Sequence, residues 1–220
     1  MKREAYGNLR TSALSLMVQV LFNTAQWILN SAYNSEMPSI RHALREKRRA
    51  IANNKRAQYA RSLLHQIQKL TNFQNGQKVA IFLPNDGEIS PKMIENFLKN
   101  HGICIYLPIL FGKSLKFAKM GKNFRKNRFS IPEPVNTPIL SANRMNIVFM
   151  PLVGFDQSKN RIGMGGGFYD RTLSFKKRQK IFNCPKLIGL AFDCQKVDRI
   201  KKQPWDVTLD LVITPSKIYR

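Results

Sequence analysis

The feature that most constrains the fold is a series of short apolar runs that alternate with helical patterns. The runs occupy residues 79–83, 103–107, 147–152, 187–192 and 209–214. Runs of this length are typical of buried parallel strands. Between the first two, a helical pattern begins at Ser90-Pro91, with Ser90 expected as the N-cap and Pro91 in the first turn, and Gly102 ends it. The alternation predicts an α/β fold with an open, mostly parallel, doubly wound sheet of the Rossmann-like three-layer type, in which ligands bind beyond the carboxyl ends of the strands.

The chain has 220 residues, which suits one α/β domain with an appendage. We assign residues 37–220 to a single domain. It begins with a helical pattern over residues 40–70, with a break expected near Asn53-Asn54. Residues 111–144 are polar and basic, and we expect them to form a β-hairpin or irregular excursion over the edge of the sheet.

Residues 1–36 do not resemble the rest of the chain. A basic start and an apolar stretch from Ala13 to Phe22 are typical of a signal peptide, but no small-residue cleavage site follows. The stretch is also too short and too interrupted to span a bilayer. An amphipathic helix that docks on the domain or on a membrane surface is one alternative. We favour another, in which translation starts at Met37 and residues 1–36 form a disordered or loosely packed helical extension.

The formal net charge of +24 is typical of nucleic-acid-binding proteins. The basic residues are spread over the chain, however, and no zinc-finger, leucine-zipper or RNA-binding aromatic motif is present. A basic enzyme surface that attracts anionic substrates explains the same charge. The three cysteines, Cys104, Cys184 and Cys194, have neither disulfide-framework nor zinc-site spacing, so we expect reduced thiols and a cytoplasmic protein.

The segment with the clearest chemistry runs from Arg161 to Asp170. Four of the five residues 163–167 are glycine, and a helical pattern follows, so backbone amides and a helix N-terminus could bind a polyphosphate. Arg161 could donate to phosphate, and Asp170 could hold Mg²⁺ against it. The segment is neither a Walker A loop nor a dinucleotide fingerprint. A flexible glycine-rich turn is the alternative, but the flanking Arg, Tyr and Asp favour a ligand-binding loop.

Residues 163–170, Gly-Met-Gly-Gly-Gly-Phe-Tyr-Asp, resemble the glycine-rich signature of the 5-formyltetrahydrofolate cyclo-ligase family. The resemblance extends from about Ile40 to Thr214. It includes the segments Arg41–Arg45, Phe82–Pro84 with Gly87–Ile89, Ile131–Pro134 and Trp205–Asp210. Three positions depart from the family pattern: Arg41 replaces a common Lys, Phe168 a common first Tyr, and Thr208 a Pro.

The resemblance implies that ATP and 5-formyltetrahydrofolate react to give 5,10-methenyltetrahydrofolate, ADP and phosphate, with Mg²⁺ as cofactor. It assigns catalysis to Arg161, Tyr169 and Glu88, and substrate contacts to Leu83, Glu88 and Tyr169. It assigns Mg²⁺ to Asp170 and Asp206, of which Asp206 rests on the resemblance alone. The expected ATP contacts are Arg41, Arg45, Arg161, Gly163, Met164, Gly165, Gly166, Gly167, Phe168 and Tyr169.

We expect the substrate to carry either one glutamate or a polyglutamate tail, and we expect a monomer that binds neither nucleic acid nor membrane. Two other classes remain open at this point. One is a basic nucleic-acid-binding protein, and the other is a sugar-phosphate isomerase or CoA-transferase relative on a similar sheet. Salt-sensitive RNA binding without folate-dependent ATP turnover would favour the first, and turnover of a sugar phosphate without ATP would favour the second.

Overall fold

The structure is a computed structural model that describes residues 3–70, 73–177 and 185–220. The chain divides into two compact units, Met1–Ile40 and Arg41–Arg220. The first helix, α1, has the bounds Arg3–Arg49 and contains Pro38. In the first unit, its apolar side chains from Leu16 to Phe22 are largely exposed. The described residues include no helix that is both long and apolar enough to cross a membrane. The predicted boundary before Met37 stays a prediction.

The helices of the second unit follow the predicted breaks closely. α1 ends at Arg49 and α2 spans Asn53–Gln68, so the break falls where Asn53-Asn54 indicated. α3 spans Lys92–Asn100. Ser90 was predicted to cap this helix, with Pro91 in its first turn. Pro91 instead occupies the cap position with a non-helical backbone, and the Ser90 hydroxyl accepts a hydrogen bond from the Lys92 amide at 3.3 Å.

In the described residues, eight strands form one sheet in the order β12-β11-β10-β7-β1-β2-β3-β6. The central strands β11, β10, β7, β1 and β2 are parallel, and the edge strands β12, β3 and β6 are antiparallel. Their bounds are β1 Lys78–Ala80, β2 Cys104–Phe111, β3 Ser114–Lys119, β6 Ile139–Leu140, β7 Ile147–Pro151, β10 Lys186–Leu190, β11 Leu211–Ile213 and β12 Ile218–Tyr219. The predicted open, mostly parallel sheet is confirmed.

The order of the strands places a topological switch between β1 and β7. The chain leaves β1 through α3 to reach β2 on one side, and it later returns to β7 on the other side. Crevices that bind ligands form at such points, beyond the carboxyl ends of the strands. The segments after β1 and after β7 are therefore the places to look for a site.

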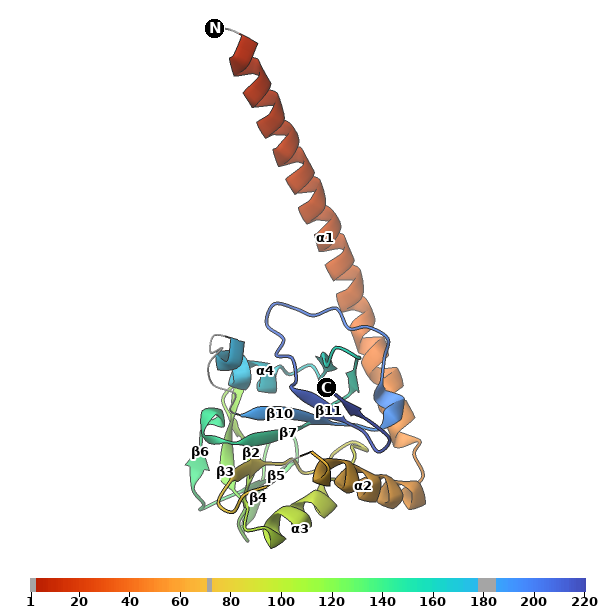
Figure 1. Cartoon of the computed structure of the whole chain (residues 1–220), viewed down its shortest axis with the longest axis vertical. Helices are drawn as coiled ribbons and strands as arrows, with labels where there is room; N and C mark the ends of the chain where they lie inside the picture. Colours follow the sequence, from red (N-terminus) through yellow and green to blue (C-terminus); the bar gives the residue numbers. More distant parts are fainter. Residues whose placement is uncertain (1–2, 71–72, 178–184) are drawn as a thin grey trace. The chain divides into compact units, whose positions relative to one another are not determined.

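Buried apolar side chains cover both faces of the sheet. On one face, α2 and α3 contribute Leu63, Ile67, Ile94 and Leu98 to a core that includes Val79 of β1. The other face packs against Leu173 of α4, whose bounds are Phe168–Leu173. Figure 1 shows α2 and α3 on the side of the sheet opposite to α4. This arrangement is the three-layer architecture that the alternating pattern predicted.

The basic excursion is built mainly from short strands, as expected. β3 and β6 extend the main sheet, while β4 (Phe124–Lys126) and β5 (Pro132–Pro134) form a separate antiparallel pair. The remaining short elements are η1 Ala142–Arg144, β8 Gly154–Phe155, β9 Arg161–Ile162, η2 Ser174–Lys177 and η3 Asp193–Gln195. The helical pattern predicted through Phe182 is α4 and η2 as far as Lys177, and the rest lies outside the described residues.

Candidate active site

The glycine-rich loop connects β9 to α4. Arg161 and Ile162 of β9 pair with β8, the loop follows, and Gly167 occupies the cap position of α4. Gly165 has φ +98° and Gly167 has φ +63°, so both adopt backbone conformations that side chains disfavour. A Cβ atom on Gly167 would also lie 2.7 Å from the Arg171 side chain. The glycines therefore shape the loop that the sequence predicted as a ligand-binding segment.

Arg41 brings the end of α1 to this loop. Its Nε donates to the Gly163 carbonyl at 3.0 Å. The side chain also lies near Gly165, where an added Cβ would be 3.8 Å from the Arg41 guanidinium carbon. The contact joins two predicted ATP-binding segments that are 122 residues apart in the sequence.

Arg45 does not join Arg41 at the loop. Its Nε donates to Asp86 Oδ2 at 2.6 Å, in the turn that follows β1. Asp86 also accepts hydrogen bonds from Arg48 and Arg49. Three arginines near the end of α1 therefore bind the same carboxylate. Burial raises the pKa of Asp86, but hydrogen bonds from Arg45 and Arg49 and the charge of Arg48 outweigh it and lower this pKa from 3.8 to about 2.

Sequence reasoning missed Asp86 and Arg48. Two signals could have found them. Asn85-Asp86-Gly87 is a turn sequence directly after a strand. Arg41, Arg45 and Arg48 also share one helix face by their spacing of four and three residues.

Glu88 lies two residues beyond Asp86 and is largely buried, with a side-chain exposure of 10 %. Its Oε2 accepts a hydrogen bond from the Asn85 amide at 3.1 Å, and its Oε1 lies 3.9 Å from the Arg48 guanidinium. Burial raises the pKa of Glu88 from 4.5 to about 7, against the opposing effects of Asn85 and Arg48. A carboxyl group with this pKa can exchange a proton near neutral pH.

Tyr169 brings α4 into the same electrostatic environment. Burial raises the pKa of its hydroxyl above 10.0, the Glu88 charge raises it further, and Arg161 lowers it. Tyr169 thus stays protonated beside Glu88. The charges of Glu88 and Arg161 both act on the Tyr169 hydroxyl, so the three residues to which the resemblance assigned catalysis share one electrostatic environment. Leu83, the remaining expected substrate contact, is partly buried and packs against the apolar core below the turn.

Arg161 and Asp170 form an ion pair across the glycine loop. The Arg161 guanidinium lies 2.6 Å from Asp170 Oδ1 and also donates to the Val207 carbonyl. Asp170 Oδ1 accepts a second hydrogen bond from the Val207 amide at 3.1 Å. Only 6 % of the Arg161 side chain is exposed, against 21 % for Asp170. The pair therefore ties the loop to the segment that carries the second predicted metal ligand, Asp206.

The carboxylates fit Mg²⁺ only in combination with other ligands. The Asp206 carboxylate accepts a hydrogen bond from the Gln203 amide at 2.8 Å. Within the described ranges, His, Cys, Asp and Glu side chains form no group of three that could hold a metal. Mg²⁺ commonly binds through one or two carboxylates together with substrate phosphates and waters. Asp170, partly exposed at the start of α4, suits that mode.

The other predicted loop residues differ in exposure. Met164 is 54 % exposed, and its sulfur lies 4.0 Å from the Arg48 guanidinium. The Phe168 ring lies edge-on to Phe129 at a centroid distance of 5.9 Å. Gly166 accepts a hydrogen bond from Arg171 through its carbonyl. Phe129 comes from the β4–β5 excursion, which therefore reaches the glycine loop.

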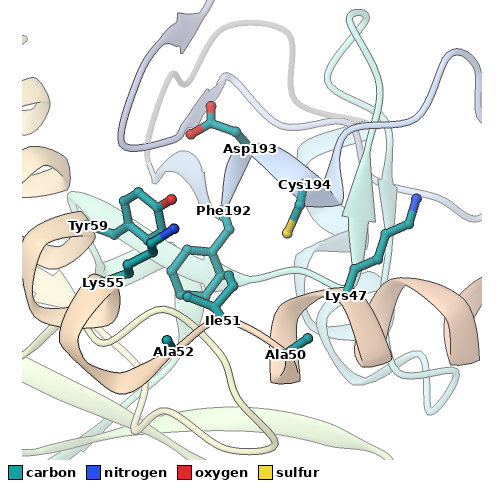
Figure 2. Close-up of a pocket in the computed structure, with 9 residues that line it drawn as sticks. All are labelled: Lys47, Ala50, Ile51, Ala52, Lys55, Tyr59, Phe192, Asp193 and Cys194. Carbon is teal, nitrogen blue, oxygen red and sulfur yellow. The ribbon is translucent and has the colours of Figure 1, made fainter.

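The structure also contains a hollow of about 290 Å³. Figure 2 shows the residues that line it. It is bordered by the connection between α1 and α2 and by η3. None of the residues that the sequence predicted for the site lines it. Its lining consists of Lys47, Ala50, Ile51, Ala52, Lys55, Tyr59, Phe192, Asp193 and Cys194. Cys194 and Cys104 are free thiols, and Cys184 lies outside the described residues.

Residues 34–215 match the model of the 5-formyltetrahydrofolate cyclo-ligase family. The chain belongs to this family. All predicted site residues lie within the matched range. The 5-formyltetrahydrofolate cyclo-ligase of Escherichia coli K12 is 32% identical over 183 residues, which cover 80% of this chain and 98% of the relative. That of Haemophilus influenzae is 34% identical, over 77% of this chain and 92% of the relative.

Solved structures of cyclo-ligase relatives share the fold. The 5,10-methenyltetrahydrofolate synthetase of Aquifex aeolicus aligns with a TM-score of 0.72 at 24% identity, over 84% of this chain and 92% of that one. The enzyme from Mycoplasma pneumoniae aligns with a TM-score of 0.66 at 24% identity, over 82% and 99%. The predicted cyclo-ligase resemblance and fold class are both confirmed, and the chain is an enzyme of this family.

Proposed function

We propose that the chain cyclises 5-formyltetrahydrofolate to 5,10-methenyltetrahydrofolate, with ATP converted to ADP and phosphate and with Mg²⁺ required. The observation that carries the proposal is the family match over residues 34–215. The contact between Arg41 of α1 and the Gly163 carbonyl supports it, because it joins the two predicted ATP-binding segments.

In the proposed reaction, the formyl oxygen of the substrate attacks the γ-phosphorus of ATP, and ADP leaves. The phosphorylated formyl carbon is then attacked by the neighbouring anilino nitrogen of the folate, which loses its proton. Cleavage of the carbon–oxygen bond releases phosphate and completes the five-membered ring. Such a reaction requires alignment and charge neutralisation more than covalent help from the protein.

The described contacts suggest which residues would bind the phosphates of ATP and which would bind Mg²⁺. The loop 163–167, of which residues 163–166 are exposed, offers backbone groups to the polyphosphate. Arg41 contacts this loop and Arg161 directly precedes it, so both supply positive charge. Arg45 lies one turn further along α1 and would act from the Asp86 side. Asp170 and Asp206 would hold Mg²⁺, whose chemistry here is to neutralise charge on the transferring phosphate.

Glu88 and Tyr169 would act on the folate. Both are partly buried and electrostatically coupled, so they offer a carboxylate and a neutral hydroxyl at one place. We assign orientation of the pterin and formyl end to Glu88, with Leu83 and Tyr169 packing on the substrate. We propose a cytoplasmic monomer that acts on 5-formyltetrahydrofolate with one or several glutamates.

The experiment is an absorbance assay for the methenyl product with the full-length chain, ATP, Mg²⁺ and 5-formyltetrahydrofolate. Product should form only when all three are present, with one ADP and one phosphate per ring closed, and EDTA should stop the reaction. Absence of product in the complete mixture would contradict the proposal.

The metal assignment has its own test in Asp170→Asn. Turnover should fall at least about a hundredfold, equivalent to about 2.7 kcal/mol, and the Mg²⁺ concentration for half-maximal rate should rise. Asp198→Asn removes an exposed carboxylate outside the site and is the matched control. An unchanged Mg²⁺ dependence in Asp170→Asn would show that the loss comes from the freed Arg161 instead.

A further inference from the structure

Arg48 is a buried cation that no part of the proposed chemistry uses. Its side chain has 0% exposure, whereas the side chains of Arg45 and Arg49 on the same helix are 32% and 42% exposed. A buried charge is costly unless its partners are complete. Its hydrogen bonds therefore indicate which parts of the molecule it holds.

The Arg48 guanidinium joins α1 to the segments that follow β1 and β7 at the topological switch, and one of its terminal nitrogens also lies 4.0 Å from the Met164 sulfur of the glycine loop. Its Nε donates to the Asp86 carbonyl at 2.9 Å, and a terminal nitrogen donates to Asp86 Oδ2 at 2.8 Å. The other terminal nitrogen donates to the Leu152 carbonyl at 3.0 Å. Asp86 follows β1 and Leu152 follows β7, so one side chain of α1 links the carboxyl ends of the two strands that flank the switch point.

The turn that Arg48 contacts is a tight turn with positive φ at both central residues. The Glu88 amide donates to the Asn85 carbonyl at 3.0 Å and closes a four-residue turn. Its two central residues, Asp86 and Gly87, have φ of +50° and +75°. Positive φ at both central positions is typical of type I′ turns, in which Asp-Gly is a preferred central pair. Arg48 donates hydrogen bonds to both the main-chain carbonyl and the side chain of Asp86. These bonds stabilise the turn conformation and therefore the position of Glu88, which ends the turn.

From these contacts we propose that Arg48 is a positioning residue for the folate half of the site. It fixes the turn at Asp86 and thereby sets where the Glu88 carboxylate lies against the substrate. The inference rests on the proposed function, because Glu88 is assigned to 5-formyltetrahydrofolate there. The Glu88 Oε1 atom lies 3.9 Å from the Arg48 guanidinium, so the two groups also interact directly by charge.

Arg49 provides a matched control on the same carboxylate. It binds Asp86 Oδ1, but 42% of its side chain is exposed. No hydrogen bond or ion pair joins it to Leu152 or Glu88 within the described residues. Replacing Arg49 therefore removes an arginine from Asp86 without removing the link between the strand ends.

The experiment compares Arg48→Lys with Arg49→Lys in the full-length chain. Lysine keeps the charge but loses the planar fork that reaches Asp86 and Leu152 together. For Arg48→Lys we expect the KM for 5-formyltetrahydrofolate to rise about tenfold or more, with the KM for ATP nearly unchanged. For Arg49→Lys both constants should stay close to those of the unmodified chain. Melting temperatures are recorded for each.

A variant that folds with both KM values unchanged, or with both raised equally, would overturn the assignment, since a purely structural role would give that result. If Arg48→Lys does not fold, Asp86→Asn replaces it, because Asn tolerates positive φ and keeps the size of the side chain while it removes the charge and one of the two acceptor oxygens. It must then raise the folate KM selectively, and a normal folate KM overturns the inference. An unmodified chain without activity would instead refute the proposed function, and the inference with it.

Discussion

At the scale of single residues, Glu88 has its carboxyl group at a place where burial disfavours the charged form. Burial raises its pKa in the folded protein from 4.5 to about 7. Below the unfolded value both states are protonated and the group has no effect on stability. Above about 7 the folded state must hold a buried charge, which costs about 3 kcal/mol by the size of this change. Stability is therefore lost as pH rises from about 4.5 to about 7.

Glu88→Gln should remove this loss. We expect the variant to be more stable than the unmodified chain at pH 8 and nearly equal to it at pH 4.5, while its turnover falls. Urea unfolding at the two pH values measures the difference. Glu46→Gln, at an exposed position of α1, is the control and should change neither value. If the free energy of unfolding changed equally with pH in Glu88→Gln and in the unmodified chain, a raised pKa of Glu88 would be contradicted.

At the scale of elements, the β4–β5 pair depends on one carboxylate. Glu133 Oε1 accepts hydrogen bonds from the Leu110 amide of β2 at 2.8 Å and from the Asn127 side chain at 2.7 Å. These bonds attach the pair to the main sheet and close its connecting loop, whose Phe129 meets Phe168 of α4. The Ile-Pro-Glu-Pro segment is therefore a structural attachment that keeps the excursion beside the glycine loop.

Glu133→Ala should loosen this attachment, because it leaves the Leu110 amide without its acceptor. The cost should be about 1–3 kcal/mol. Hydrogen exchange should accelerate in residues 122–135 and stay unchanged in α3. Lys126→Ala changes an exposed residue of the same pair and should leave exchange unaltered. Uniform acceleration over the whole domain would mean that the pair does not open as a separate element.

At the scale of the whole molecule, we predict that the family-like part of the chain is separable from its first residues. The family match begins at residue 34, and all candidate site residues lie at or after Arg41. A chain that starts at Met37 should fold with a melting temperature within about 3 °C of the full-length protein, a difference of about 1 kcal/mol for a domain of this size. Its turnover should match that of the full length.

Thermal unfolding and the methenyl assay on both chains measure this prediction. A chain that starts at Pro84, after β1 and just before the turn, is the negative control and should not fold. A tenfold fall in turnover for the chain that starts at Met37, about 1.4 kcal/mol in activation free energy, would show that residues 1–36 belong to the working enzyme.

Local patterns were sufficient for the architecture and for the position of the glycine loop. Apolar runs such as 147–152 became strands because a buried strand needs apolar residues on both faces, which a sequence displays directly. The break before Asn53 and the loop at residues 163–167 were visible for a similar reason, since turn residues and glycines act on their own backbone. Strand ends were less predictable because pairing with neighbours decides them: the run 79–83 pairs as a strand only over Lys78–Ala80.

Only the tertiary structure decided which charges meet. Helical spacing placed Arg41 and Arg45 on one face, but Arg41 contacts Gly163 while Arg45 binds Asp86. The sequence alone also determined that Arg161 and Asp170 flank the glycines, and the fold then paired them with each other. The physical reason is that an ion pair depends on distances between segments up to 122 residues apart. Those distances are set by the order of the strands and the packing of α1, which no local pattern encodes.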